Sequence, residues 1–186
     1  MKVLALLGSP RRKGNTGIVL ERVLSPLRAA GMKVEVAFLG GRRLVGCVEC
    51  FTCQKREDRP NCPVKDDIRP LLRKIHSADA IVFATPVFCW GASAQLKAVM
   101  DRLFSFGKYG KSPHISLLEG KRAALVTTAG GALDEGTGIT AQSYRSLADF
   151  FRIVRCGELK AVSLGTPEET RACRKVLARA ERFGRA

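Results

Sequence analysis

Residues 3–16, which read VLALLGSPRRKGNT, decide the fold that we expect for this chain of 186 residues. The apolar run Val3–Leu7 predicts a first buried parallel strand. A short polar and basic loop follows, and then apolar residues recur at helical spacing from Ile18 onward. A strand, a loop and a helix in this order bring backbone N–H groups and the positive end of a helix dipole to one point. The stretch therefore predicts an anion site that holds one phosphate group.

The composition of the loop supports a phosphate and excludes two common nucleotide motifs. Its hydroxyl, amide and cationic donors are Ser9, Arg11, Lys13, Asn15 and Thr16. Pro10 stands where a dinucleotide fingerprint needs its second glycine, and Lys13 precedes Gly14 instead of following it as in a Walker loop. The alternative is an ordinary strand-to-helix turn in which Asn15 and Thr16 cap the helix.

The whole chain predicts one soluble domain over residues 1–186. Hydrophobic residues make up 46% and charged residues 26%, which is ordinary for a globular protein. The apolar run at the N-terminus is too short for a secretory signal, and no stretch approaches the length of a membrane span. We therefore expect a cytoplasmic protein with no membrane partner.

The net charge of +15 indicates a negatively charged ligand or partner. The basic residues are spread from Arg11 to Arg185, and aromatic residues amount to only 6%. Stacking platforms for nucleic acid are therefore scarce, and specific nucleic-acid binding is not favoured. A phosphorylated cofactor or an acidic electron-transfer protein fits the charge equally well.

Strands and helices are expected to alternate along the chain. Apolar runs predict five strands at 3–7, 33–39, 79–84, 123–128 and 153–162. Helical spacing and start signals predict five helices, at 15–30, from 66–67 onward, and at 94–104, 137–151 and 167–182. Pro26 should kink or shorten the first helix, because it cannot donate a backbone hydrogen bond. Five such units predict an α/β fold of flavodoxin-like type, a five-stranded parallel sheet in the order 2-1-3-4-5 with helices on both faces.

In that topology the loops after strands one, three and four meet at one edge. The second of these loops is apolar and aromatic where polar turn residues are usual; it consists of Thr85, Pro86, Val87, Phe88, Cys89, Trp90 and Gly91. Phe88 and Trp90 beside a phosphate site favour a flat ring, although they also suit a core or a dimer interface. The third loop follows Thr128 and contains Ala129, Gly130 and Gly131, whose glycines permit close backbone approach. Together the three loops describe FMN better than ATP or NAD.

Four cysteines form a second cluster, in a loop at about residues 44–65. Cys47, Cys50, Cys53 and Cys62 have the spacing C-x2-C-x2-C-x8-C. Four thiolates suit an iron–sulfur cluster, and they also suit zinc. The long gap before Cys62 leaves its role as a ligand open. The sequence is thus compatible with a [4Fe–4S] cluster, with zinc or with no metal.

Taken together, these motifs resemble the NADPH-dependent FMN reductase family of flavodoxin-like proteins, and most of all its iron–sulfur flavoproteins. The resemblance rests on the opening at 8–16, the acidic pair at 66–67, and the stretches ADAIVFATPVF at 78–88 and SAQLKAVMDR at 93–102. It covers about residues 1–131.

The resemblance implies a role for each loop. Ser9, Arg11, Asn15 and Thr16 would hold the FMN phosphate, residues 86–91 would lie along the isoalloxazine and ribityl chain, and residues 129–131 would contact the pyrimidine edge. The flavin would then carry the redox chemistry without a catalytic acid–base pair. The electron donor would be NADPH or an acidic ferredoxin-like carrier.

The sequence also predicts an oligomer and leaves one other class of function open. Aromatic side chains in or after the second loop predict a homodimer or homotetramer; they are Phe88, Trp90, Phe104, Phe106 and Tyr109. The leading function is an FMN-dependent oxidoreductase or electron-transfer flavoprotein. The alternative is a non-catalytic zinc- or nucleic-acid-binding module that uses the cysteine loop and the basic surface.

Overall fold

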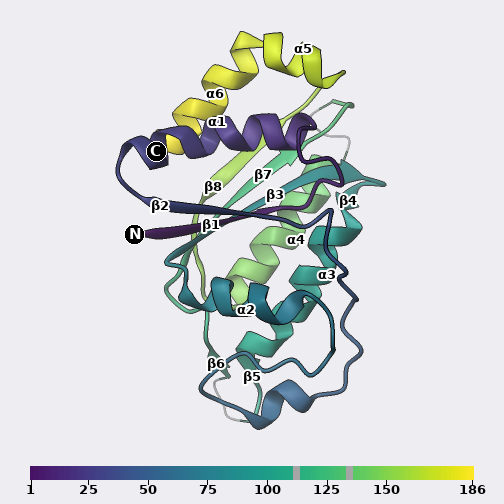
Figure 1. The fold of residues 1–186 in the computed structure, drawn as a ribbon, viewed down its shortest axis with the longest axis vertical. Helices are drawn as coiled ribbons and strands as arrows, with labels where there is room; N and C mark the ends of the chain where they lie inside the picture. The colour runs from purple at the N-terminus through teal and green to yellow at the C-terminus, as the bar shows by residue number, and fades with distance from the viewer. Residues whose placement is uncertain (111–113, 133–135) are drawn as a thin grey trace.

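The computed structural model describes residues 1–110, 114–132 and 136–186. The main strands are β1 (Lys2–Leu7), β2 (Lys33–Phe38), β3 (Ala80–Phe88), β7 (Arg122–Thr128) and β8 (Val154–Ala161). The helices are α1 (Asn15–Ala29), α2 (Ile68–Ser77), α3 (Ala94–Arg102), α4 (Thr137–Phe150), α5 (Pro167–Ala172) and α6 (Arg174–Arg185). Figure 1 shows the sheet running across the molecule between two groups of helices.

The sheet order is β2-β1-β3-β7-β8, and all of these neighbours are parallel. With the five strands counted in chain order, this is the predicted 2-1-3-4-5. The register aligns Leu4 with Ile81 and Ile81 with Ala123. The expected flavodoxin-like topology is therefore confirmed, with the carboxyl ends of β1, β3 and β7 side by side.

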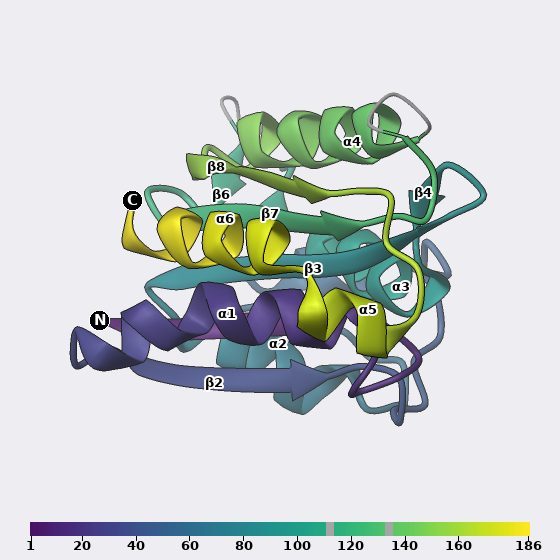
Figure 2. The ribbon, with the colours of Figure 1, turned by 90° about the horizontal axis from the view of Figure 1, so that it is seen from above.

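Both faces of the sheet are buried, which explains why its strands are continuously apolar. Along β1, Val3, Ala5 and Leu7 pack in one core cluster with residues of α1 and α6. Leu4 and Leu6 pack on the other face, in the cluster that α2, α3 and α4 cover. Figure 1 shows these two helix groups above and below the sheet. In Figure 2, which looks down from above, α1 and α6 lie in front of the sheet.

The third strand is longer than predicted and forms a hairpin. It extends to Phe88, and the short strand β4 (Gly91–Ala92) pairs with it antiparallel. Only Cys89 and Trp90 remain between the two strands, with φ of 45° and 61°. A two-residue turn with positive φ at both positions usually contains asparagine and glycine, so this turn is strained. Much of the loop expected at 85–91 is therefore strand and tight turn.

Other differences from the predicted elements concern the helices. Helix α1 continues one turn beyond Pro26, so the expected shortening does not occur. The last helix is two helices, because Cys173 interrupts it with φ −76° and ψ 83°. Phe106, expected near an interface, is fully buried in the core. None of the helices among the described residues has both the length and the apolar character of a bilayer span.

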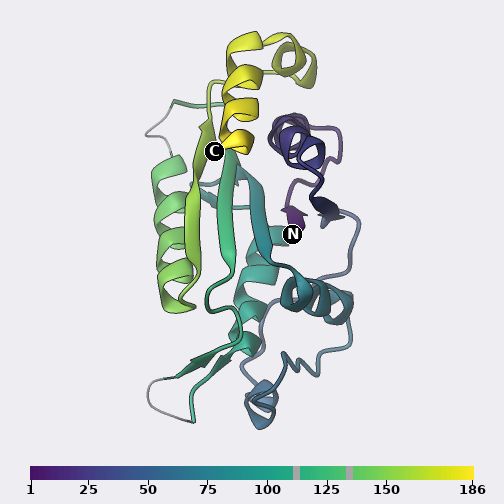
Figure 3. The ribbon, with the colours of Figure 1, turned by 90° about the vertical axis from the view of Figure 1, so that its left-hand side faces the viewer.

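Residues after α3 build an extension that the sequence did not indicate. A 3-10 turn at Leu103–Phe106 leads into the short antiparallel strands β5 (Gly107–Lys108) and β6 (Ile115–Ser116). A second 3-10 turn, at Thr52–Lys55, belongs to the cysteine loop. Figures 1 and 3 show both segments together at one end of the molecule, below the sheet.

Candidate functional site

The loop after β1 is closed by hydrogen bonds between its own residues, and the N-terminus of α1 has no side-chain cap. Arg11 N–H donates to the Ser9 hydroxyl (3.1 Å), which donates to the Arg11 carbonyl (3.0 Å). Helix α1 begins after Gly14, and no side chain caps it. The N–H groups of a first helical turn have no partner within the helix. The expected alternative, a helix capped by Asn15 or Thr16, is therefore wrong, and the uncapped N-terminus suits an anion.

Two neighbouring arginines of this loop point to different places. Arg11 lies over the helix start, with its Nε 3.5 Å from where a Cβ on Gly14 would stand. The Arg12 guanidinium instead lies over the Phe38 ring, 5.4 Å from its centroid. A Cβ on Gly17 would be only 2.2 Å from the Arg12 carbonyl oxygen, so the tight loop requires glycine at position 17. Arg11 is therefore the arginine placed for an anion at the helix start.

Asn15 and Thr16 join the loop to neighbouring segments. Asn15 Nδ2 donates to the Gly165 carbonyl (2.8 Å), and the Thr16 and Thr128 hydroxyls share a buried 2.7 Å hydrogen bond. Asn15 Oδ1 is buried and has no hydrogen-bond partner among the described residues. Both side chains were predicted to donate to a phosphate; here Asn15 donates to Gly165, and either hydroxyl can be the donor in the Thr16–Thr128 bond. An unpartnered acceptor remains beside the helix start.

The loops after β1 and β3 are joined by Ser93, the N-cap of α3. Its hydroxyl donates to the Gly8 carbonyl (2.6 Å), and its N–H donates to the Thr85 hydroxyl (3.0 Å). Gly8 N–H donates to the Ala84 carbonyl (2.7 Å). With the Thr16–Thr128 bond, these contacts confirm that the loops after β1, β3 and β7 meet at one edge.

The aromatic turn stands out from this edge. Phe88 is 51% exposed and Trp90 65% exposed, so neither belongs to the core of this chain. Gly136, at the start of α4, packs so closely that a Cβ there would lie 2.9 Å from Trp90 Cα. The turn is thus supported from behind while its rings face outward.

The segment after β7 is held to the segment after β8. Ala129 N–H donates to the Ala161 carbonyl (3.0 Å), and Ser163 N–H donates to the Gly131 carbonyl (3.0 Å). Gly130 between them is exposed. Ala129 and Gly131 therefore use these backbone groups within the protein, and the contact of residues 129–131 with a ligand edge stays a prediction. Residues 133–135 lie outside the described part of the chain.

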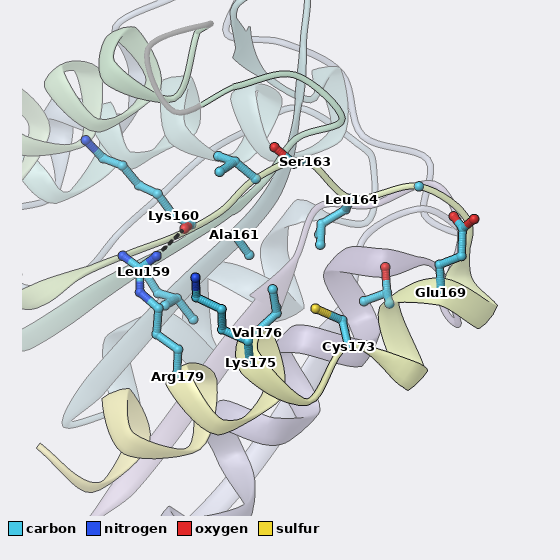
Figure 4. A pocket seen from close by; sticks show the side chains of 13 residues that line it. Leu159, Lys160, Ala161, Ser163, Leu164, Glu169, Cys173, Lys175, Val176 and Arg179 are labelled. Carbon is cyan, nitrogen blue, oxygen red and sulfur yellow. Dashed lines mark hydrogen bonds between the residues drawn. The ribbon is translucent and has the colours of Figure 1, made fainter.

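A groove lies next to this edge, because its lining residues Ala161, Ser163 and Gly165 are hydrogen-bonded to Ala129, Gly131 and Asn15. It has a volume of about 750 Å³ and lies between β8 and the helices α5 and α6. In Figure 4, Arg179 donates to the Lys160 carbonyl (3.3 Å) across this groove, and Cys173 lies opposite Leu164. None of the predicted site residues lines it. A smaller groove of about 560 Å³ adjoins the predicted phosphate loop, residues 8–16, and is lined by Arg12, Lys13 and Arg171 among others.

The cysteine loop presents its thiols unequally. Cys47 and Cys50 are exposed, Cys62 is half-buried and Cys53 is buried, and all are free. A hydrogen bond from the Thr52 backbone lowers the pKa of the Cys50 thiol, whereas burial raises the pKa of Cys53. Within residues 1–110, 114–132 and 136–186, no three cysteine, histidine or carboxylate side chains are already grouped as metal ligands.

The cysteine loop follows β2, whose end lies beside that of β1, but it runs away from the three sheet loops (Figure 1). Cys62 contacts Arg102, the last residue of α3. The sheet loops instead contact Ser93, which directly precedes the first turn of α3. Nine residues of helix rise about 14 Å, so the two sites lie at opposite ends of α3. Sequence reasoning assigned no role to Ser93 or Arg102. A serine directly before a helical run is a capping signal that points to Ser93; no comparable local signal marks Arg102.

Comparisons with known proteins agree with the fold described above. Residues 1–163 match the family described as NADPH-dependent FMN reductase. An iron–sulfur flavoprotein of Methanocaldococcus jannaschii is 37% identical over 102 residues, which cover 55% of this chain and 51% of that protein. An iron–sulfur flavoprotein of Methanosarcina thermophila is 28% identical over 156 residues, covering 82% of this chain and 74% of the relative.

A solved structure extends the similarity to the whole fold. The NAD(P)H:quinone oxidoreductase from Methanothermobacter marburgensis superposes with a TM-score of 0.73 at 26% identity, covering 100% of this chain and 98% of that one. The matches to the first curated relatives are shorter than this superposition. The chain spans only about half the length of each of these relatives.

Proposed function

Because the chain belongs to the NADPH-dependent FMN reductase family, we propose that it is an oxidoreductase that binds one FMN at the loops after β1, β3 and β7. The observation that carries the proposal is the uncapped N-terminus of α1, with Arg11 over it and two neighbouring loops hydrogen-bonded beside it. That arrangement offers a phosphate both unpaired N–H groups and positive charge.

The residues present fit FMN. The first turn of α1 takes the phosphate, and the buried, unpartnered Asn15 Oδ1 is an acceptor for a hydroxyl such as those of the ribityl chain. The exposed Phe88 and Trp90 rings provide an apolar wall for the isoalloxazine. The residues that we assign to the cofactor are Ser9, Arg11, Lys13, Asn15, Thr16, Pro86, Val87, Phe88, Cys89, Trp90, Gly91, Thr128, Ala129, Gly130 and Gly131.

The protein's part in the reaction is binding and orientation. When bound, FMN supplies hydride and electron transfer, so no side chain of the chain needs to act as acid or base. Ser9 and Thr16 fix the shape of the phosphate loop through their hydrogen bonds to Arg11 and Thr128. The strained turn at Cys89–Trp90 holds the Trp90 ring outward, and the Phe88 ring before the turn is exposed as well. The two rings would exclude water from one side of a flavin.

Two adjacent arginines provide the test of the FMN site. Replacing Arg11 with Ala removes the cation over the helix start and should weaken FMN binding by about 10- to 100-fold, because a charge-assisted contact contributes roughly 1.5–3 kcal/mol. Arg12→Ala removes the same charge from the same loop, but its guanidinium lies on Phe38, so FMN affinity should change less than about threefold. Equal losses in both variants, by fluorescence titration, would reduce the assignment to non-specific attraction.

We further propose that Cys47, Cys50, Cys53 and Cys62 hold a [4Fe–4S] cluster. Four thiols in one loop are the donor set that such a cluster takes, and curated relatives of the chain are named iron–sulfur flavoproteins. Anaerobically purified protein should contain about four iron and four sulfide per chain. Cys53→Ala should remove the iron yet leave FMN bound, since α3 separates the two sites. Stoichiometric zinc, or no metal, would contradict this assignment.

The electron donor and the assembly complete the proposal. The charge of +15 suits an acidic ferredoxin-like carrier, and NADPH is the alternative donor that the family description names. The exposed rings of Phe88 and Trp90 favour a homodimer or homotetramer that covers them. Light scattering at micromolar concentration should report more than one chain per particle. Seven free cysteines suit the reducing cytoplasm.

A further inference from the structure

A buried arginine connects the two ends of the cysteine loop. Arg102 is only 2% exposed. Its Nη1 donates to the Val45 carbonyl (2.7 Å), and its Nε donates to Cys62 Sγ (3.1 Å). Its Nη1 and Nη2 also bind the two carboxylate oxygens of Asp66, at 3.2 and 3.3 Å. One side chain thus holds the start of the loop, its last cysteine and the residue that leads into α2.

A buried lysine holds the middle of the same loop. Lys108 is 3% exposed, and its Nζ donates to the carbonyls of Cys53 (2.9 Å), Ser105 (2.7 Å) and Arg59 (3.3 Å). The Gln54 side chain binds the same segment, donating to the Gly107 carbonyl (3.0 Å) and accepting from Tyr109 N–H (3.2 Å). The Cys53 turn is therefore attached to β5.

The charges of these two residues need an explanation, because a buried cation is costly unless it is neutralised. Asp66 neutralises Arg102. The hydrogen bonds of Lys108 go to carbonyl oxygens, and the acidic groups that act on it, Cys53, Asp58 and Glu57, belong to the cysteine loop itself. The Lys108 ammonium thus lies directly behind Cys53, where thiolates that ligate a metal would bring negative charge.

The same contacts account for the unusual gap of eight residues before Cys62. Lys108 holds both Cys53 and Arg59, so the chain folds back within the gap. Arg102 then receives Cys62 on the same side as Val45, two residues before Cys47. The added length is therefore taken up in a closed fold, and Cys62 returns toward the first cysteines.

We propose that Arg102 and Lys108 are positioning residues that shape the cysteine loop for metal ligation. Arg102 holds Cys62 as the fourth thiolate and closes the loop, and Lys108 holds the Cys53 turn and offsets thiolate charge. The proposal rests on the metal site proposed above. It adds that this site is shaped by one residue from the end of α3 and one from β5, both outside the loop itself.

The first experiment uses metal-free protein and so does not depend on a cluster. Loss of Arg102 alone would leave the buried Asp66 carboxylate without its ion-pair partner, so the variant combines Arg102→Gln with Asp66→Asn. Amides in residues 44–62 should then exchange with deuterium faster, while those of β1 and β3 keep wild-type rates and FMN stays bound. Lys108→Gln should act in the same way on residues 52–59. Lys97→Gln is the control, because it removes an exposed cation from the same helix. Wild-type exchange of the loop in both variants would overturn the proposal.

The second experiment measures the ligands. After anaerobic reconstitution with Fe²⁺ and sulfide, the variant with Arg102→Gln and Asp66→Asn should bind iron about 10- to 100-fold more weakly than wild type, measured by competition with a chelator. A loss of this size is typical when the partner of a metal ligand is removed. Arg102→Lys keeps the pairing with Asp66 but cannot reproduce the Nε contact, so slow amide exchange should return while iron binding stays weak. Full recovery of iron affinity by lysine would overturn the role of Arg102 at Cys62. A wild-type protein that takes up no iron would refute the cluster, whereas fast loop exchange in the variants would still support the positioning role.

Discussion

The carboxyl edge of the sheet and the cysteine loop lie at opposite ends of α3 and are stabilised in different ways. At the sheet edge, Gly8, Thr85 and Ser93 exchange short hydrogen bonds between neighbouring strands. In the cysteine loop, regular structure amounts to one 3-10 turn, and the buried cations Arg102 and Lys108 hold the backbone.

This difference shows what each region demands of its surroundings. Parallel strands place loop ends side by side wherever the sheet forms, so a site at the sheet edge needs only short polar links. An irregular loop has backbone carbonyls that no ladder satisfies, and buried donors must come from elsewhere. The cysteine loop therefore depends on tertiary contacts in a way that the phosphate loop does not.

The largest expected effect comes from Gly17, at the sheet edge. In Gly17→Ala the new Cβ would lie 2.2 Å from the Arg12 carbonyl oxygen, so the phosphate loop must move. We expect the free energy of unfolding to fall by about 3 kcal/mol and FMN binding to be lost. Iron uptake by the cysteine loop should survive in the folded fraction. Gly138→Ala is the matched control: its Cβ meets open space in α4, and it should stabilise by about 0.5–1 kcal/mol. Retained FMN affinity in Gly17→Ala would contradict the loop geometry.

The next effect separates stability from function within the sheet edge. Cys89→Asn with Trp90→Gly introduces residues that tolerate the positive φ of the turn. The free energy of unfolding should rise by about 2 kcal/mol, because strain at such positions costs about 1–3 kcal/mol each. FMN affinity should fall, since the Trp90 ring is gone. Thermal unfolding and flavin titration measure the two outcomes, and an unchanged melting temperature would argue against strain.

A smaller effect tests the link between the loops after β1 and β7. Thr16→Val leaves the buried Thr128 hydroxyl without its partner and should cost about 1–2 kcal/mol. Thr128→Val should cost a similar amount. The double variant replaces both partners and should recover part of the loss. Strictly additive losses in denaturant titrations would mean that the two hydroxyls do not interact.

The smallest effect concerns acid and should appear in the cysteine loop alone. Burial tends to raise the pKa of Asp66, but backbone donors Val45 and Ile68 and the Arg102 guanidinium outweigh it, so the pKa lies below the usual 3.8. A lowered folded pKa means that the carboxylate stabilises the fold above pH 3.8 and that this contribution is lost as pH falls through the folded value. Below about pH 4, residues 44–65 should gain hydrogen exchange before the strands do. Asp66→Asn should remove this acid step, and its persistence in that variant would assign it to another group.

Much of the fold followed from patterns within single segments. Continuous apolar runs such as Val3–Leu7 predicted buried parallel strands and their order, and the confirmed sheet contains all five. The shortening predicted from Pro26 does not occur, because a helix with several packed apolar residues tolerates one missing donor near its end. The break at Cys173 had no local signal such as proline or glycine.

The candidate site was predictable where residue type alone carries chemistry. Cysteine spacing, the basic loop and the aromatic residues at 88 and 90 are the sequence features from which the proposed sites are built. Their partners were harder to predict. Nothing near Asn15 in the sequence indicates that its amide serves Gly165, and nothing near Cys62 indicates Arg102, forty residues away.

The sequence by itself therefore determined the sheet, its order and the chemistry available at each loop, because hydrophobic period and residue type act locally. Tertiary structure alone decided where that chemistry is placed. It joined Thr16 to Thr128, turned Cys89 and Trp90 outward, and carried the cysteines to the far end of α3. The physical reason is that buried polar groups must find partners, and those partners are chosen by which segments the folded sheet and helices bring together.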